Sequence, residues 1–250
     1  MSDLDLKPTE PQFPPLFSGL EVAAGIDPFA KACAEAALGC DAGLVVYTAA
    51  GTDMRAAVVF APEQPLDEAM AVFKACGVGF QNALGALAPP EVGVHLSWDG
   101  QIFVNGARCG RLQVAAATTE GAAEPDWIVV GIELPILPPN PDTPGLTPED
   151  TCLYEEGCAE VDSVHLLEAW VRHTLVWISR LEADGPRSLH GEWRGLARDV
   201  GEDISLMLQE RSYSGTFMGV DEHFGMLLRN ADGETTVLPL RLILETGGTA

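Results

Sequence analysis

The chain has very few lysines. Among its 250 residues there are only three, Lys7, Lys31 and Lys74, and none follows position 74. Lysine and arginine together number 14 against 37 acidic residues, which gives a formal net charge of -23. Nucleic-acid binding requires cationic side chains clustered on one surface, and here the cations are scattered. We therefore expect no nucleic-acid partner and at most a weak preference for basic partners.

Long apolar runs are also missing. The sequence contains no run of 18 or more apolar residues, the length from which a membrane-spanning helix is expected. The N-terminus, MSDLDLKPTEPQFPPL, is acidic and rich in proline, whereas a secretory signal begins with basic residues and continues with an apolar segment. These absences predict a cytoplasmic protein with no membrane partner.

The six cysteines match no common metal or redox motif. Their shortest spacings are C-x6-C and C-x5-C, unlike the short paired spacings of zinc sites. We expect no metal site, and we expect most of the cysteines to be small buried thiols. Cys109 differs from the others because Arg108 precedes it, and a neighbouring guanidinium favours the thiolate.

Cap residues and apolar periodicity predict two helices in the first third of the chain. Asp27 is a suitable N-cap for the first. The second is expected over residues 66–87, with Gly77 and Gly79 as places where it can bend. Lys74 lies in this second helix and is interpreted as a solvated surface charge.

Further elements follow from turn residues and apolar runs. Residues 43–47 and 55–60 are valine-containing runs bounded by glycine or proline, which favours buried strands. Asp162 can cap a third helix that ends at Gly185. Residues 230–233, NADG, favour a hairpin turn between short antiparallel strands.

Two sequence stretches carry a family resemblance. The first is VHLSWDGQIFVNGARCGRLQV, from residue 94, followed by DWIVVGIELP. It resembles the paired strands of biotin and lipoate protein ligases, in which a tryptophan-containing strand end, a hairpin and a glycine-rich return strand surround the carboxylate ligand. Trp98 matches the motif tryptophan, Asp99 falls near its acidic end, and Gly131 matches the return strand.

The chain departs from that family at its cations. Ser97 precedes the tryptophan where the family has lysine, and Ala107 or Arg108 occupies the place of the central lysine. The family's loop rich in glycine and arginine corresponds to TAAGTDMR, which keeps Gly51 and a single arginine, Arg55.

The second stretch, SGTFMGVDEHFGMLLRNADGETTVLPL, resembles the small C-terminal barrel of the same ligases. The resemblance implies an α+β fold, with a mixed sheet and helices followed by an SH3-like β-barrel. We expect a flexible N-terminus at 1–15, a ligase-like domain at 16–190 and the small barrel at 191–250.

The missing lysines bear on activity. Adenylation of a carboxylate requires positive charge near the phosphates. We therefore expect a divergent or catalytically impaired member of the family that binds a small carboxylate or a protein partner. Two alternatives stay open: an active ligase that uses ATP with biotin or lipoate and modifies an acceptor protein, with arginines in place of the lysines, and a cysteine-dependent acyltransferase. A homodimer formed through sheet edges is a further option that the resemblance implies.

The resemblance also implies a ligand pocket, although no catalytic residue is assigned. The pocket residues expected are Gly51, Arg55, Trp98, Asp99, Arg108, Gly110 and Gly131. Arg108 and Arg111 are three positions apart in a strand, so strand alternation predicts that they point to opposite faces. At most one of them is then expected to face a shared pocket.

Overall fold

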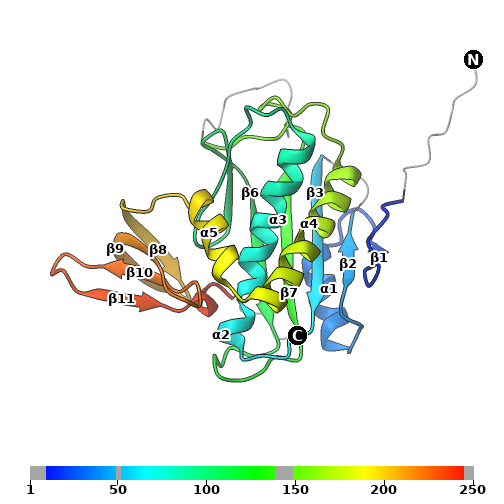
Figure 1. The fold of residues 1–250 in the computed structure, drawn as a ribbon. Coiled ribbons are helices and arrows are strands. Elements are labelled where there is room, and N and C mark those ends of the chain that lie inside the picture. Colours follow the sequence, from blue (N-terminus) through cyan, green and yellow to red (C-terminus); the bar gives the residue numbers. More distant parts are fainter. Residues whose placement is uncertain (1–9, 49–51, 139–148, 245–250) are drawn as a thin grey trace, which may run out of the picture.

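The computed structural model describes residues 10–48, 52–138 and 149–244. They form a seven-stranded sheet with helices on both faces and a separate four-stranded sheet (Figure 1). The larger sheet has the order β1-β2-β3-β7-β6-β5-β4. Its strands are β1 (Ser18–Glu21), β2 (Leu44–Tyr47), β3 (Asp53–Phe60), β4 (Val94–Leu96), β5 (Gln101–Val104), β6 (Ala107–Ala116) and β7 (Ile128–Pro135).

The larger sheet is mixed. β1 runs parallel to β2, and the other neighbouring strands are antiparallel. The strands expected at 43–47 and 55–60 are present as β2 and β3. The α+β class expected from the sequence is confirmed.

Helices cover the two faces of this sheet unequally. On one face α3 (Ala71–Leu87) and α4 (Ser163–Asp184) lie side by side (Figure 1), and the indole Nε1 of Trp170 donates to the carbonyl of Cys76 at 3.0 Å. On the other face the short helix α1 (Pro28–Ala37) covers an apolar cluster of β2, β3, β6 and β7. Because α1 is short, part of its face of the sheet carries polar side chains.

The predicted helix caps are confirmed. The Asp27 carboxylate accepts from the amides of Phe29 and Ala30 at 3.2 and 3.3 Å, and it begins α1. The Asp162 carboxylate does the same for α4, which ends at Gly185. These ends follow from local sequence because a cap satisfies the first free amides of a helix.

The prediction of a single helix over residues 66–87 is wrong. The chain forms α2 (Leu66–Ala69) and then α3, with Met70 between them. Gly79 serves close packing, because a Cβ there would lie 2.9 Å from the backbone nitrogen of Thr174 in α4. The absence of a side chain at Gly79 therefore brings the two helices together.

The smaller sheet follows α5 (Arg187–Leu196) and has the order β11-β10-β9-β8. Its strands are β8 (Asp203–Leu208), β9 (Arg211–Val220), β10 (Met226–Arg229) and β11 (Thr235–Leu238), and a short 3-10 helix, η1 (Leu240–Ile243), follows them. All its pairs are antiparallel, which is compatible with an SH3-like barrel. Within the described residues β8 and β11 are not paired with each other, so the sheet is open. The predicted turn joins β10 to β11, with Gly233 N donating to Asn230 O at 3.1 Å.

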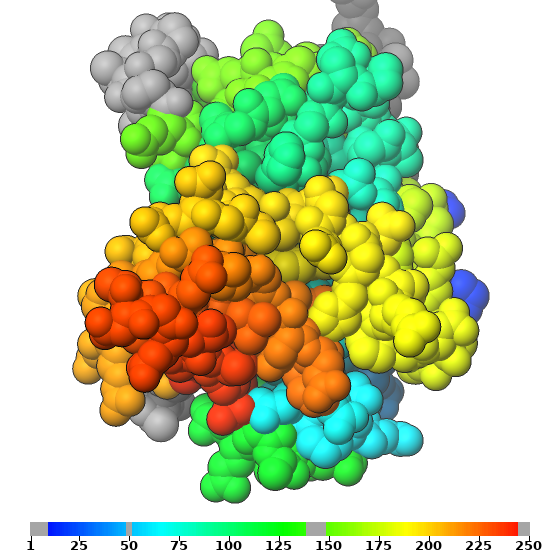
Figure 2. All heavy atoms as spheres, turned by 60° about the vertical axis from the view of Figure 1, so that its left-hand side comes forward, coloured from blue at the N-terminus to red at the C-terminus, as the bar shows by residue number. Residues whose placement is uncertain are grey.

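The smaller sheet packs directly on the larger unit. Figure 2 shows the orange and red C-terminal segment against the yellow α5 and the cyan α2. The indole of Trp98 donates to the carbonyl of Phe224 at 2.7 Å, and Arg241 forms an ion pair with Asp67 at 2.5 Å. Both contacts join residues that are far apart in the sequence, so they fix the position of the smaller sheet against the larger unit.

In the part of the chain described by the structure, no helix is long and apolar enough to cross a membrane.

Candidate functional site

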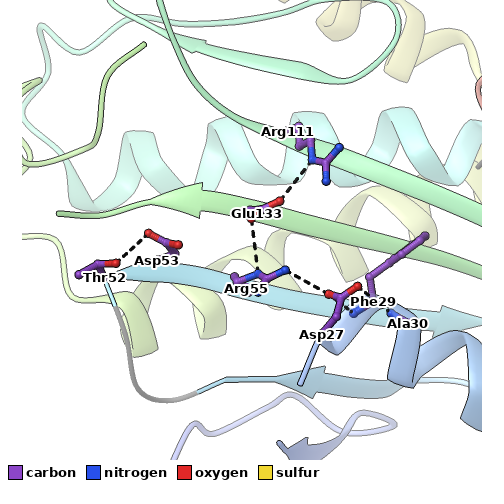
Figure 3. Close-up of polar contacts among 8 residues, drawn as sticks. All are labelled: Asp27, Phe29, Ala30, Thr52, Asp53, Arg55, Arg111 and Glu133. Carbon is purple, nitrogen blue, oxygen red and sulfur yellow. Dashed lines mark hydrogen bonds and ion pairs between the residues drawn. The ribbon is translucent and has the colours of Figure 1, made fainter. Parts of the chain in front are cut away.

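A row of charged side chains crosses the α1 face of the larger sheet. Arg55 of β3 is directly opposite Glu133 of β7, and Glu133 is opposite Arg111 of β6. Opposed residues on neighbouring strands project to the same face. With Asp27 of the α1 cap and Asp53 of β3, these three residues form what we call the sheet-face cluster (Figure 3).

Glu133 holds the two arginines of the cluster together. Its Oε2 is 3.3 Å from Arg111 Nε and its Oε1 is 3.6 Å from Arg55 Nε. Arg55 also reaches the Asp27 carboxylate, with 3.3 Å between Nη2 and Oδ1 (Figure 3). The three central side chains are between 32% and 48% exposed, so each ion pair stabilises the fold by about 1 kcal/mol or less.

The charges of the cluster do not favour a polyphosphate. Its two guanidinium groups lie among three carboxylates, of which Asp53 accepts from the hydroxyl of Thr52 at 3.1 Å. A polyanion is stabilised by excess positive charge. The cluster instead favours a ligand with a single carboxylate, which can take the place of the Glu133 carboxylate between the two arginines.

A β-bulge changes the orientation expected for Arg108. Gln101 pairs with Arg111 and Phe103 pairs with Arg108, and the register shifts between these pairs. Since Gln101 and Phe103 lie on one face of β5, Arg108 and Arg111 share a face too. The prediction of opposite faces is therefore wrong, because simple alternation does not hold across a bulge.

Although Arg108 is on that face, another carboxylate engages it. Its Nε donates to Asp150 Oδ1 at 2.5 Å, and this bond raises the pKa of Arg108 and lowers the pKa of Asp150. The Arg108 side chain is 52% exposed. The structure thus places Arg108 in a separate ion pair at the surface and not in the sheet-face cluster.

The expected pocket glycines serve close packing. A Cβ at Gly110, which has a φ of +152°, would lie 2.4 Å from the carbonyl oxygen of Glu133. A Cβ at Gly131 would lie 2.6 Å from the Phe29 ring of α1. Gly131 thus lies beneath α1, two residues before Glu133, and Gly51 lies outside the described residues.

Trp98 and Asp99 lie apart from the sheet-face cluster, in the turn between β4 and β5. The Trp98 side chain is 2% exposed, and its indole bonds to Phe224 in the smaller sheet. The Phe224 ring stacks on His190 of α5, with 3.9 Å between the ring centroids. Trp98 therefore occupies the contact between the two sheets.

Lys74 is buried at the same contact, so its interpretation as a surface charge is wrong. It is 2% exposed, and its Nζ donates to the carbonyl of Trp98 at 2.5 Å. The ammonium lies 4.5 Å from the ring centroid of Trp193 and 5.6 Å from that of Trp98. Burial lowers the pKa of Lys74 to about 7, while the charge of Asp99 acts in the opposite direction.

An open cleft lies beside Trp98, between the β4–β5 turn and β8. We call it the inter-sheet cleft, and it has a volume of about 340 Å³. It is lined by residues 97–99, 198–199 and 202–206, with the buried side chains of Phe217 and Met226. The sequence prediction of a ligand pocket included Trp98 and Asp99, which line this cleft, and it included no residue of the smaller sheet.

Burial raises the pKa of five of the six cysteines, which disfavours their thiolates; these are Cys40, Cys76, Cys109, Cys152 and Cys158. Cys109 has no exposed surface, and burial raises its pKa above the ordinary value. The structure therefore gives no support to the expectation that Arg108 favours a thiolate at Cys109, because the Arg108 side chain bonds to Asp150. Within the described residues, no three His, Cys, Asp or Glu side chains are grouped to hold a metal ion.

With this geometry in place, comparison with known proteins gives the family. The sequence profile of the biotin/lipoate A/B protein ligase family matches residues 13–195. The chain belongs to that family. A second profile, described as a domain of unknown function, matches residues 200–246.

Individual relatives of this ligase-family chain differ widely in similarity. A solved biotin protein ligase-like protein of unknown function from Silicibacter sp. TM1040 is 54% identical, with a TM-score of 0.86 over 94% of this chain and all of that one. The biotin protein ligase of Aquifex aeolicus has a TM-score of 0.70 at 15% identity, over 91% of this chain and 96% of that one. A biotin-[acetyl-CoA-carboxylase] ligase of Paracoccus denitrificans is 22% identical over 62% of this chain, and the match spans 65% of that ligase.

Proposed function

We propose that this ligase-family chain binds a small carboxylate between Arg55 and Arg111 and does not adenylate it. The observation that carries the proposal is the position of the Glu133 carboxylate, with one oxygen 3.6 Å from Arg55 and the other 3.3 Å from Arg111. Two guanidinium groups on the strands that flank β7 form a site for a carboxylate, and Glu133 of β7 occupies that site in the free protein.

The absence of adenylation follows from charge. ATP adds several negative charges, and the reaction develops more on the departing pyrophosphate. Among the described residues, Arg55, Arg108 and Arg111 are each engaged by an acidic side chain. The Aquifex aeolicus ligase has been solved with biotin and ATP, so the fold can accept both ligands. In this chain the sheet-face cluster suits the organic acid better than the nucleotide.

One observation favours an active ligase as the second candidate. The β6 bulge places Arg108 on the same face as Arg111, which brings a third guanidinium to the face that carries Arg55. In this alternative, MgATP displaces the acidic partners and the arginines act in place of the family lysines. An acceptor protein would then complete the reaction.

Titration calorimetry tests the proposal. Biotin, lipoate and octanoate are each titrated into the wild-type protein and into Arg111→Ala, with Arg211→Ala of the smaller sheet as the matched control. We expect at least one acid to bind without nucleotide, and we expect Arg111→Ala to weaken its binding by about 1 kcal/mol, the upper end for a half-exposed ion pair. Binding that requires MgATP would favour the ligase, and equal binding to all three proteins would contradict the proposed site.

A further inference from the structure

Strand β8 forms one wall of the inter-sheet cleft and has a free edge. Among the strands that the structure describes, it pairs with β9 alone. The two strands are joined by Gln209 and Glu210, which both have a positive φ, at 46° and 64°. This geometry is typical of a two-residue hairpin, in which the flanking pair, Leu208 and Arg211, is hydrogen-bonded.

The hairpin register determines which backbone groups of β8 face outward. Hydrogen-bonded and non-bonded pairs alternate along an antiparallel ladder. Because the Leu208 pair is bonded, the backbone groups of Leu206 and Ile204 also bond to β9. The N–H and C=O groups of Ser205 and Asp203 point away from β9. Ser205 and Asp203 also line the inter-sheet cleft. The cleft is therefore bordered by strand groups that can pair with another chain.

The cleft has an excess of negative charge. Asp99, Asp199, Glu202 and Asp203 line it. Asp99 accepts from the Ser97 hydroxyl at 2.5 Å and Asp203 accepts from the Thr216 hydroxyl at 2.7 Å. These bonds hold the two carboxylates in place, and the ammonium of Lys74 offsets part of the charge of Asp99.

The single arginine of the cleft lining is turned toward other partners. Arg198 donates through Nη1 to the carbonyl of Gly106 at 3.0 Å, and its guanidinium lies 4.0 Å from the ring centroid of Phe103. Its Nε is 3.2 Å from Asp199, so it offsets one carboxylate at most. The carboxylates that Arg198 does not offset favour binding of a cationic group in the cleft.

We propose that the inter-sheet cleft is a docking site for an extended basic peptide segment of a partner protein. The segment adds to the free edge of β8 by strand pairing. A lysine or arginine side chain of the segment lies among the cleft carboxylates, and a neighbouring apolar side chain packs on Ile204 and Leu206, the partly exposed apolar residues of the cleft lining. A second copy of this chain is disfavoured at the same edge, because each copy would bring its own cleft carboxylates, Asp99, Asp199, Glu202 and Asp203, to the contact. The inference does not rest on the carboxylate site proposed above.

Hydrogen exchange tests the pairing residue by residue. The probe is a six-residue peptide of alternating valine and lysine, and the control peptide has glutamate in place of lysine. We expect the lysine peptide to slow exchange of the Asp203 and Ser205 amides, because these become bonded. The Ile204 and Leu206 amides already bond to β9 and should not change.

Substitutions test the charge and the strand edge separately. Glu202→Gln combined with Asp203→Asn should weaken peptide binding about five- to thirtyfold, the scale of two exposed charge pairs, and should reduce its salt dependence. Ser205→Pro removes one outward N–H at an edge position that tolerates proline, and it should weaken binding at least tenfold. Glu234→Gln, in the β10–β11 turn outside the cleft, is the matched control and should bind as the wild type does.

Several results would overturn the inference. These are equal binding of the glutamate peptide, unchanged affinity in the Glu202→Gln/Asp203→Asn variant, and exchange protection that depends on protein concentration and not on peptide. The last would identify a second copy as the occupant. If Ser205→Pro does not fold, the charge variant and the amide pattern still decide the question. None of these measurements involves biotin, lipoate or octanoate, so their failure is separate from failure of the carboxylate site.

Discussion

Replacing Lys74 by methionine should stabilise the protein at low pH. Methionine is unbranched and one atom shorter than lysine, and it removes the ammonium from a site that is 2% exposed. Burial lowers the pKa of Lys74 from 10.5 to about 7. At about 1.4 kcal/mol per pH unit, this shift corresponds to a penalty of about 4 to 5 kcal/mol for the folded, protonated state.

Removing the ammonium relieves this penalty, but it also removes the favourable contacts that the ammonium makes. The Trp98 carbonyl would lose its donor at 2.5 Å, at a cost of about 1 to 3 kcal/mol. The attraction to the rings of Phe73, Trp98 and Trp193 would also be lost, at about 0.5 to 2 kcal/mol. We therefore expect Lys74→Met to raise the free energy of unfolding by about 1 to 3 kcal/mol at pH 6.

The pH dependence of this difference gives the sharper test. Because the folded pKa of Lys74 is below its unfolded value, the penalty is complete below about pH 7 and declines as the pH rises toward 10.5. From pH 6 to pH 8.5 the wild-type protein should gain about 2 kcal/mol relative to Lys74→Met. Other titrating groups cancel in the comparison, because both proteins contain them.

Urea unfolding at pH 6, 7, 7.75 and 8.5 measures the difference. Lys31→Met is the matched control, because the Lys31 side chain is 40% exposed and its substitution should give a difference independent of pH. If the difference between wild type and Lys74→Met is the same at pH 6 and pH 8.5, Lys74 does not carry a lowered pKa, and the account of its burial is incorrect.

Three further predictions concern the larger sheet. Glu133→Gln should tighten binding of a small carboxylate about five- to tenfold by calorimetry, because the competing charge is removed from between the arginines; weaker binding would mean that Glu133 assists the ligand. Gly131→Ala should lower the free energy of unfolding by about 1 to 3 kcal/mol, because its Cβ would meet the Phe29 ring at 2.6 Å, and Phe29→Leu should recover part of the loss. Arg108→Ala should change the free energy of unfolding by less than about 1 kcal/mol, because its ion pair with Asp150 is exposed; a larger loss would show that the pair is more than a surface contact.

Much of the fold could be predicted from local sequence. Asp27, Asp162 and Gly185 mark helix ends through groups that satisfy the terminal backbone. The α+β class came from the family resemblance, and the family is confirmed by the match over residues 13–195. The division of the chain between residues 190 and 191 stays a prediction, as does a homodimer.

The position of Lys74 could have been anticipated. It is the single charged residue in α3, AVFKACGVGFQNALGAL, and a helix that is apolar all round is normally buried. The error came from judging the lysine by its type and not by its helix. Its partners, by contrast, depend on the packing of Trp98 and Trp193, which the sequence does not specify.

The candidate sites depended on register and tertiary contact. The pairing of Arg55 with Glu133 joins strands 78 positions apart in the sequence, and the β6 bulge reverses the alternation expected for Arg108. The inter-sheet cleft requires the docking of β8 beside Trp98. Single-sequence patterns contain none of these long-range distances.

The most direct test of the central claim is pyrophosphate exchange with ATP. The purified chain is incubated with MgATP, labelled pyrophosphate and biotin, lipoate or octanoate in turn. We predict no label in ATP above a control without acid, even at acid concentrations that saturate binding. Acid-dependent label in ATP would contradict the proposal and establish that the arginines support adenylation.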